Sequence, residues 1–183
     1  VLVVSHVTSN VIDALPNTSK LTVGGSAAFN LLTNSTGGVM TLAPWSGTAL
    51  QLVNNSRIGV EVGTIGSSIA LNTGAKALVN GTVYVDAYFL SGQTPPALST
   101  VISAPSGGLL TTNGSSGNYV LGNLYNVTNF TVTGITQSDT LVQLNTLSTS
   151  ALTAAYWKGG FSGTSTDEWA VSNGTTLSNW ATD

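Results

Sequence analysis

The chain has few charged residues, no cysteine and almost no helix signals. Only 6% of its 183 residues are charged, against about 25% in an average globular protein. The four Lys and Arg residues stand singly, so no basic patch can neutralise a row of phosphates and we expect no nucleic-acid partner. The lack of cysteine excludes disulfides, thiolate chemistry and Cys-based metal sites. Solubility therefore depends on Ser, Thr and Asn side chains.

Long apolar runs are also missing. The first residues, VLVVSHV, are apolar for only four positions before Ser5 and His6. A membrane span needs about 20 apolar residues, and a signal-peptide core needs a longer run than this one. We expect no membrane insertion, and we expect any export signal to have been removed already.

Strand signals replace the missing helix signals. The best helical stretch, residues 7–15, is ended by Pro16, whereas short β-branched or aromatic runs between Gly, Asn, Ser and Pro recur along the chain. The runs predict strands at 2–7, 20–23, 28–32, 39–42, 49–53, 57–62, 68–71, 76–79, 82–90, 99–103, 119–121, 130–133 and 140–144.

Two of these strands alternate clearly, which predicts one dry face and one wet face. The residues expected on the dry face are Ile58, Val60 and Val62 in one strand and Val83, Val85 and Ala87 in the other. The residues expected on the wet face are Arg57, Gly59 and Glu61, and Thr82, Tyr84 and Asp86.

The spacing predicts a single all-β domain over residues 1–183. Between residues 28 and 79 the strands recur about every ten residues, which suits a β-sandwich or jelly roll and equally a right-handed β-helix with coils of roughly 20 to 25 residues. Short strands, turns of Asn, Ser, Thr and Gly that can stack, and few edge charges favour the β-solenoid. The sandwich stays as the alternative. Residues 91–96 (SGQTPP) predict a seam, because proline supplies no amide hydrogen for pairing.

The C-terminal segment, residues 154–183, is rich in Trp and Gly. Trp157, Trp169 and Trp180 are spaced to anchor successive strand-turn units. Together with VISAPSGGLLTTNGSSGNYVLG (101–122) and LYNVTNFTVTGI (124–135), this segment resembles bacterial secreted proteins that carry autotransporter-associated β-strand repeats. The resemblance implies a passenger-type β-helix at the cell surface and a chain that is part of a longer one.

No catalytic or metal motif stands out. His6 has Asp13 nearby but no nucleophile elbow, and the adjacent acids Asp167 and Glu168 point opposite ways on an extended chain. Calcium-binding nonapeptide turns require an Asp after their glycines, which is absent here. The unmatched calcium candidates are Asp86, Asp139 and Asp167. We therefore expect no enzyme activity, no metal and no cofactor.

Aromatic rings and glycosylation sequons remain as candidate sites. The rings either stack on sugars or, as the favoured interpretation, fill core and coil-end positions; they are Trp45, Trp157, Trp169, Trp180, Tyr84, Tyr88, Tyr119, Tyr125 and Tyr156. Candidate N-glycosylation sites are Asn17, Asn34, Asn54, Asn80, Asn113, Asn126, Asn129 and Asn173.

These observations predict a structural or adhesive segment of a secreted cell-surface protein. The alternative is a self-assembling filament or surface-layer subunit, with Val1, Leu2, Val3 and Val4 as a strand donated to a neighbouring copy. A carbohydrate-binding or polysaccharide-acting protein is the third hypothesis. The expected partners are other copies, neighbouring segments of a longer chain and glycans.

Overall fold

The computed structural model describes residues 20–33, 37–43, 47–110, 117–127, 130–148, 156–157 and 180–181. The chain divides into two compact units, Val1–Ser148 and Thr149–Asp183. The described residues form strands and turns without a helix, and none of them forms a helix able to cross a membrane. The prediction of an all-β fold is confirmed.

The first unit contains β1 to β12, and the second contains β13 (Tyr156–Trp157) and β14 (Trp180–Ala181). The strands of the first unit are β1 (Leu21–Val23), β2 (Ala28–Leu31), β3 (Gly38–Leu42), β4 (Thr48–Leu52), β5 (Ser56–Val62), β6 (Ser67–Leu71), β7 (Lys76–Val79), β8 (Thr82–Phe89), β9 (Leu98–Ser103), β10 (Asn118–Tyr125), β11 (Phe130–Gln137) and β12 (Leu141–Ser148).

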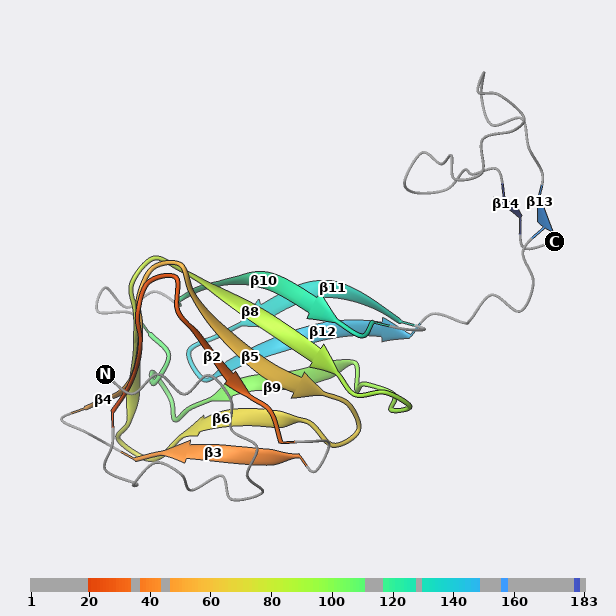
Figure 1. The fold of residues 1–183 in the computed structure, drawn as a ribbon. Coiled ribbons are helices and arrows are strands. Elements are labelled where there is room, and N and C mark those ends of the chain that lie inside the picture. Colours follow the sequence, from red (N-terminus) through yellow and green to blue (C-terminus); the bar gives the residue numbers. More distant parts are fainter. Residues whose placement is uncertain are drawn as a thin grey trace. The chain divides into compact units, whose positions relative to one another are not determined.

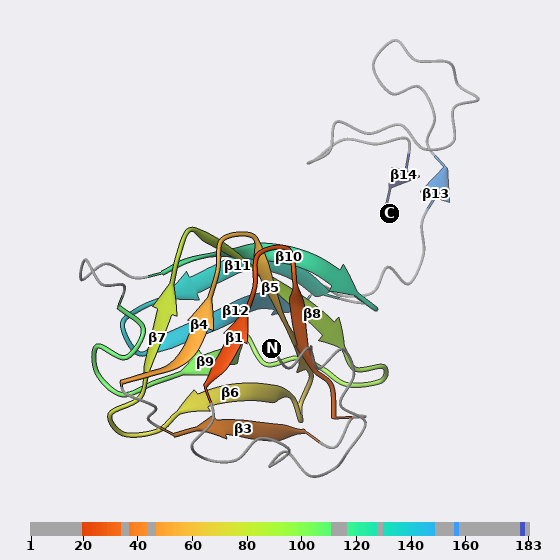
Figure 2. The same cartoon turned by 60° about the vertical axis from the view of Figure 1, so that its left-hand side comes forward.

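Three sheets with parallel strands make up the first unit. Their strand orders are β1-β4-β7, β10-β8-β5-β2 and β11-β12-β9-β6-β3. From β1 to β6, every strand pairs in parallel with the strand three places later in the chain. Figure 1 shows β2, β5, β8 and β10 side by side in one sheet, and Figure 2 shows all three sheets around a common interior.

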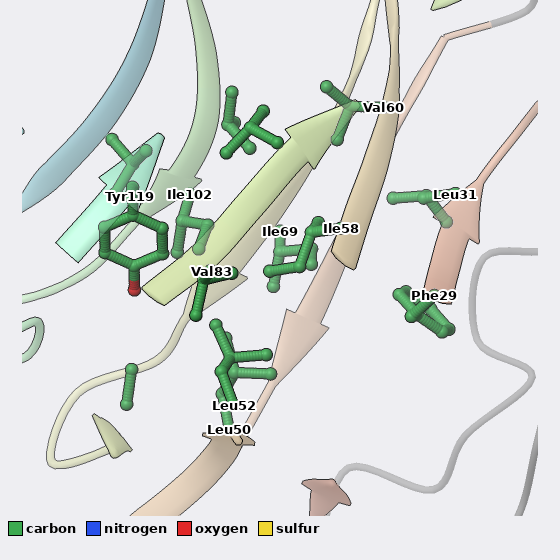
Figure 3. Close-up of a cluster of buried hydrophobic side chains, with 14 of the residues drawn as sticks. Phe29, Leu31, Leu50, Leu52, Ile58, Val60, Ile69, Val83, Ile102 and Tyr119 are labelled. Carbon is green, nitrogen blue, oxygen red and sulfur yellow. The ribbon is translucent and has the colours of Figure 1, made fainter. Parts of the chain in front are cut away.

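The parallel register places apolar residues from successive strands on top of one another. Phe29 lies opposite Ile58, and Ile58 lies opposite Val85. In the third sheet Met40 lies opposite Ile69 in the same way. Side chains from the three sheets converge on the interior (Figure 3), where most are fully buried. This interior is the main source of stability, because burial of apolar surface is the dominant favourable term in folding.

The predicted dry faces are confirmed. Ile58, Val83, Val85 and Ala87 have no exposed surface, and Val60 is almost fully buried. The prediction of a wet opposite face is wrong in part, because Gly59, Glu61 and Asp86 on that face are also buried. In a parallel stack, side chains of neighbouring strands pack against one another on the outer face and exclude water from the charges among them.

Asparagine side chains form hydrogen bonds at one corner between the first two sheets. The Asn54 side-chain oxygen accepts a hydrogen bond from the backbone N–H of Thr82 at 2.8 Å. Gly81 beside it has a φ of +76°, and a Cβ there would lie 2.2 Å from that same oxygen, so only glycine fits. Asn118 continues this corner by donating to the Thr82 hydroxyl at 2.8 Å.

In the third sheet the parallel pairing ends at β9. β12 pairs antiparallel with β9, and β11 pairs antiparallel with β12. At the same end of the unit, the carbonyl of Gly108 accepts a hydrogen bond from Ala77 of β7 at 2.7 Å, and Leu109 is fully buried. This end is therefore covered by a hairpin and a loop.

The predicted seam at residues 91–96 is the connection from β8 to β9. It is held against the β5–β6 turn by two hydrogen bonds: Thr64 donates to the carbonyl of Thr94 at 3.1 Å, and Ile65 donates to the side chain of Gln93 at 3.1 Å. Most of its residues are exposed, as expected for a surface loop.

Candidate binding surface

A group of aromatic, amide and charged side chains lies on the outer face of β2, β5, β8 and β10. We call it the tyrosine–arginine cluster, and it consists of Asn30, Arg57, Tyr84, Asp86, Tyr88, Asn123 and Tyr125. Each of the four strands contributes at least one member because their register aligns outward positions. No other group in the described chain combines three tyrosines with an ion pair.

Gly59 makes the first contact of the cluster possible. It lies between Asn30 of β2 and Asp86 of β8 in the register. A Cβ on Gly59 would lie 2.3 Å from the Asn30 side-chain oxygen and 2.8 Å from the Tyr88 ring. Without it, the Asn30 amide reaches across β5 and donates to the Tyr88 hydroxyl at 3.0 Å. Glycine here permits side chains two strands apart to meet.

Two tyrosines of neighbouring strands stack. The rings of Tyr88 and Tyr125 are 4.4 Å apart between centroids and inclined by only 9°. Asn123 fixes the second ring by donating its amide to the Tyr125 hydroxyl at 3.1 Å. Tyr125 keeps 38% of its surface exposed, so it is a rigid ring with one side open to solvent.

Arg57 and Asp86 form an ion pair beside these rings. The Arg57 Nε donates to Asp86 Oδ2 at 2.8 Å, and its Nη2 donates to Oδ1. The guanidinium also lies over the Tyr84 ring, 5.2 Å from the centroid. The hydrogen bond to Asp86 raises the pKa of Arg57 above its ordinary value, and burial opposes this increase.

A β-bulge in β10 supplies a further hydrogen-bond donor to Asp86. The register of β10 against β8 shifts between Leu121 and Leu124. This shift directs the backbone N–H of Asn123 to Asp86 Oδ1 at 2.6 Å. A Cβ on Gly122 would lie 2.3 Å from the same carboxylate oxygen. Asp86 therefore joins three strands through its carboxylate.

The chemistry of the cluster is mainly structural. One face of the Tyr84 ring is covered by Arg57, and Tyr88 and Tyr125 cover each other. The charges of Arg57 and Asp86 cancel. What the cluster offers to a ligand is the open side of Tyr125 beside an asparagine amide, a neutral surface suited to a sugar ring rather than to an ion.

Stability at alkaline pH should depend on Tyr88. Burial and the neighbouring Tyr125 raise the pKa of Tyr88 to about 12, from 10.0. Because the folded state holds this proton more tightly than the unfolded chain, the contribution to stability is complete below pH 10 and is lost as the pH rises towards 12. We expect the melting temperature to fall over this range, and the fall should be smaller in Tyr88→Phe. An equal fall in both proteins would contradict the assignment.

The structure places several of the predicted site residues apart from this cluster. Of the sequons, Asn54, Asn80 and Asn126 lie at exposed turns, although the Asn54 oxygen is bound to Thr82. The other sequons lie outside the described residues: Asn17, Asn34, Asn113, Asn129 and Asn173. Glycosylation stays a prediction at all eight.

The tryptophan anchors lie in the second unit. Trp157 of β13 pairs with Trp180 of β14 in an antiparallel register. Trp169 lies outside the described residues, as do Trp45 and the acids Asp167 and Glu168. The same holds for the N-terminal residues Val1, Leu2, Val3, Val4, His6 and Asp13.

Two of the calcium candidates have structural partners. Asp86 binds Arg57, and the Asp139 carboxylate accepts a hydrogen bond from the backbone N–H of Gly107 at 2.9 Å, which closes the loop after β9. The described residues contain no group of three or more His, Cys, Asp or Glu that could hold a metal. Tyr119, a member of the predicted ring set, is buried at 4% exposure, and burial raises its pKa.

Sequence reasoning missed the ion pair and the asparagine–tyrosine contact. The available signal was the sequence separation of Arg57 and Asp86. They are 29 positions apart, close to the separation of paired residues in neighbouring parallel strands. A search for opposite charges one repeat apart would therefore have found this ion pair.

Comparison with known protein families, with curated proteins and with solved structures finds no match to this chain.

Proposed function

We propose that the chain is a non-enzymatic structural or adhesive segment of a secreted cell-surface protein, and that its first unit is a right-handed β-helix. The observation that carries the proposal is the parallel pairing of each strand from β1 to β6 with the strand three places later. This pairing is the one expected when three strands make one coil and successive coils stack. A sandwich or jelly roll is built mainly from antiparallel pairs.

The repeat length supports the coil. Phe29 pairs with Ile58 and Ile58 with Val85, which gives a repeat of about 28 residues, within the 20 to 50 residues of known solenoid repeats. Parallel crossover connections are right-handed in about 98% of cases, which favours the right-handed form. In such a stack each repeat contacts only its neighbours, so added repeats add length.

The composition supports a role at a surface. Outer positions carry hydroxyls and amides rather than charges, and the tyrosine–arginine cluster ties strands together with little charge left over. The resemblance to proteins with autotransporter-associated β-strand repeats suggests the same extracellular location and partners among neighbouring segments of a longer chain. The proposal includes neither a cofactor nor a catalytic residue.

Engineered disulfides test the coil directly, because the chain has no native cysteine. Thr22 pairs with Gln51 in the first sheet. Paired residues of adjacent strands lie within the distance that a disulfide spans. We expect Thr22→Cys/Gln51→Cys to form an intramolecular disulfide in oxidising buffer, measured by mass spectrometry. Thr22→Cys/Thr41→Cys, which joins different sheets, is the control; cross-linking of the control alone would contradict the coil.

A self-assembling filament subunit is the second candidate. β1, β2 and β3 are end strands of their sheets, and no described strand pairs with their outer edges. Such edges accept an added strand from another chain. The predicted donor, Val1 to Val4, lies outside the described residues.

Electron microscopy separates the two candidates. For a segment of a longer protein we expect single particles of the purified chain in negative stain, unchanged by deletion of residues 1–7. Fibres with a constant axial repeat that disappear on this deletion would favour the filament instead.

A further inference from the structure

The outer edges of β2 and β3 are regular and pair with no described strand. The pairing of β2 with β5 and of β3 with β6 contains no register shift. By contrast, the pairings of β10 and β11 with their neighbours each contain a shift, and β-bulges of this kind protect an edge against added strands. β2 and β3 also carry no charged residue and no proline. Their outer edges are therefore suited to accept further strands.

The inward side chains of β2 and β3 are buried in spite of these edges. Phe29 and Met40 are each 4% exposed, and Leu31 and Leu42 are each 2% exposed. Among the described strands they have a paired neighbour on one side only, in β5 or in β6. Burial this complete is expected when another layer of side chains lies on the opposite side.

The sequence before β1 has the spacing of one more coil. Phe29 of β2 precedes Met40 of β3 by 11 positions, and the residues that pair with them in β5 and β6 are separated by the same interval. Val1 and Ile12 are also 11 positions apart. Each of these two residues lies 28 positions before its counterpart in β2 or β3, which is the length of one repeat. A single alignment therefore places both segments in register.

The residues around Val1 and Ile12 fit the same alignment. Apolar residues fall at the inward positions of β2 and β3. Asp13, the only charged residue before Lys20, falls at the position of Thr41, which is exposed on the outer face. The aligned pairs are Val1 with Phe29, Val3 with Leu31, Val11 with Val39, Ile12 with Met40, Ala14 with Leu42 and Pro16 with Pro44.

We propose that residues 1–15 dock on their own chain as a further coil of the first unit, with residues 1–4 paired to β2 and residues 10–15 paired to β3. This docking rests on the coil proposed above. It assigns the apolar N-terminal residues to the protein's own sheets, whereas the filament candidate donates them to a neighbouring copy. The docked segment would cover the interior at β3, the end of the third sheet opposite β11, and would block two edges against association with other copies.

An engineered disulfide tests the docking in the full chain. Val39 is 54% exposed, so a cysteine at this position is accessible to oxidant. We expect Val11→Cys/Val39→Cys to form an intramolecular disulfide, measured by mass spectrometry, because paired residues of adjacent strands lie within the distance that a disulfide spans. Val39→Cys/Ser68→Cys joins β3 to β6 and is the positive control. Leu2→Cys/Val39→Cys would join different sheets and should not cross-link.

Two alanine variants test the same alignment without cysteine. Ile12 is assigned to the interior and Val11 to the outer face. We expect Ile12→Ala to lower the melting temperature by at least about 5 °C and Val11→Ala to lower it by less than about 2 °C.

Three outcomes would overturn the docking. The first is an intermolecular disulfide in Val11→Cys/Val39→Cys, which would place the segment on a neighbouring copy. The second is no disulfide in this variant while Val39→Cys/Ser68→Cys cross-links. The third is an equal melting temperature for the two alanine variants.

The disulfide test of the coil distinguishes the two proposals. If Thr22→Cys/Gln51→Cys cross-links and Val11→Cys/Val39→Cys does not, the coil stands and the docking of residues 1–15 is wrong. If Thr22→Cys/Gln51→Cys does not cross-link, the coil itself is wrong.

Discussion

Replacing Arg57 with alanine should destabilise the first unit by about 3 kcal/mol, because it leaves a buried carboxylate without its cation. The Asp86 side chain is only 4% exposed, whereas that of Arg57 is 27% exposed. Asp86 would keep the N–H of Asn123 as a donor but would lose both bonds from the guanidinium. Chemical denaturation of the variant and the parent protein, monitored by circular dichroism, measures the difference.

Substitution of the other member of the ion pair, Asp86, is the matched control. Asp86→Ala should destabilise less than Arg57→Ala, since water can still solvate the partly exposed guanidinium. The double variant should be more stable than the sum of the single effects predicts, because each single change leaves the other group unpaired. Strictly additive effects, or a loss below about 0.5 kcal/mol for Arg57→Ala, would show that the pair is not coupled.

Leu52→Ala should destabilise the first unit by about 3 to 4 kcal/mol, within the 2 to 5 kcal/mol seen when a buried leucine is truncated. Leu52 is fully buried and lies between Val23 and Val79 in the first sheet. Its loss would leave a cavity that the stacked neighbours on both sides cannot close, because β4 is held by a strand on each edge. The melting temperature should fall by on the order of 10 °C.

Leu147 provides the control of the same residue type. It lies on β12 and is 62% exposed, so Leu147→Ala should change stability by less than about 0.5 kcal/mol. If the two alanine variants melted at the same temperature, the interior formed by the three sheets would not be the core of the protein.

The strands could largely be predicted from the sequence. Runs such as RIGVEV and TVYVDAYF combine β-branched residues with period-two alternation, and they form β5 and β8. The last three strands of the first unit extend further than predicted. β10, for instance, continues through Gly122 and Asn123, which have low strand propensity, because the Asp86 carboxylate binds the bulge. Such tertiary contacts are invisible in a local sequence window.

The order of the strands could not be predicted in the same way. Phe29, Ile58 and Val85 occupy equivalent positions of successive repeats and share only their apolar character, so no consensus repeat can be written. The repeats also differ in length, because the third contains the 91–96 loop. The observed repeat of about 28 residues is longer than the coil of roughly 20 to 25 residues expected from the sequence.

The candidate site was predictable only as a set of residue types. Tyr84, Tyr88 and Tyr125 belonged to the predicted set of rings, and all three lie on one surface. Their hydrogen-bond partners depend on the strand register. It places Asn30 within reach of Tyr88 across Gly59, which has no side chain to separate them.

The antiparallel pairing of β12 with β9 has a consequence for how such a protein changes over evolution. A duplicated block of β4 to β6 inserted before β7 would find parallel edges on both of its sides and would leave the closing hairpin untouched. A block added after β12 would meet the antiparallel strand β11 at the edge of the third sheet. For the proposed β-helix, insertions and deletions of three-strand blocks are therefore expected in the interior of the unit rather than beside its antiparallel hairpin.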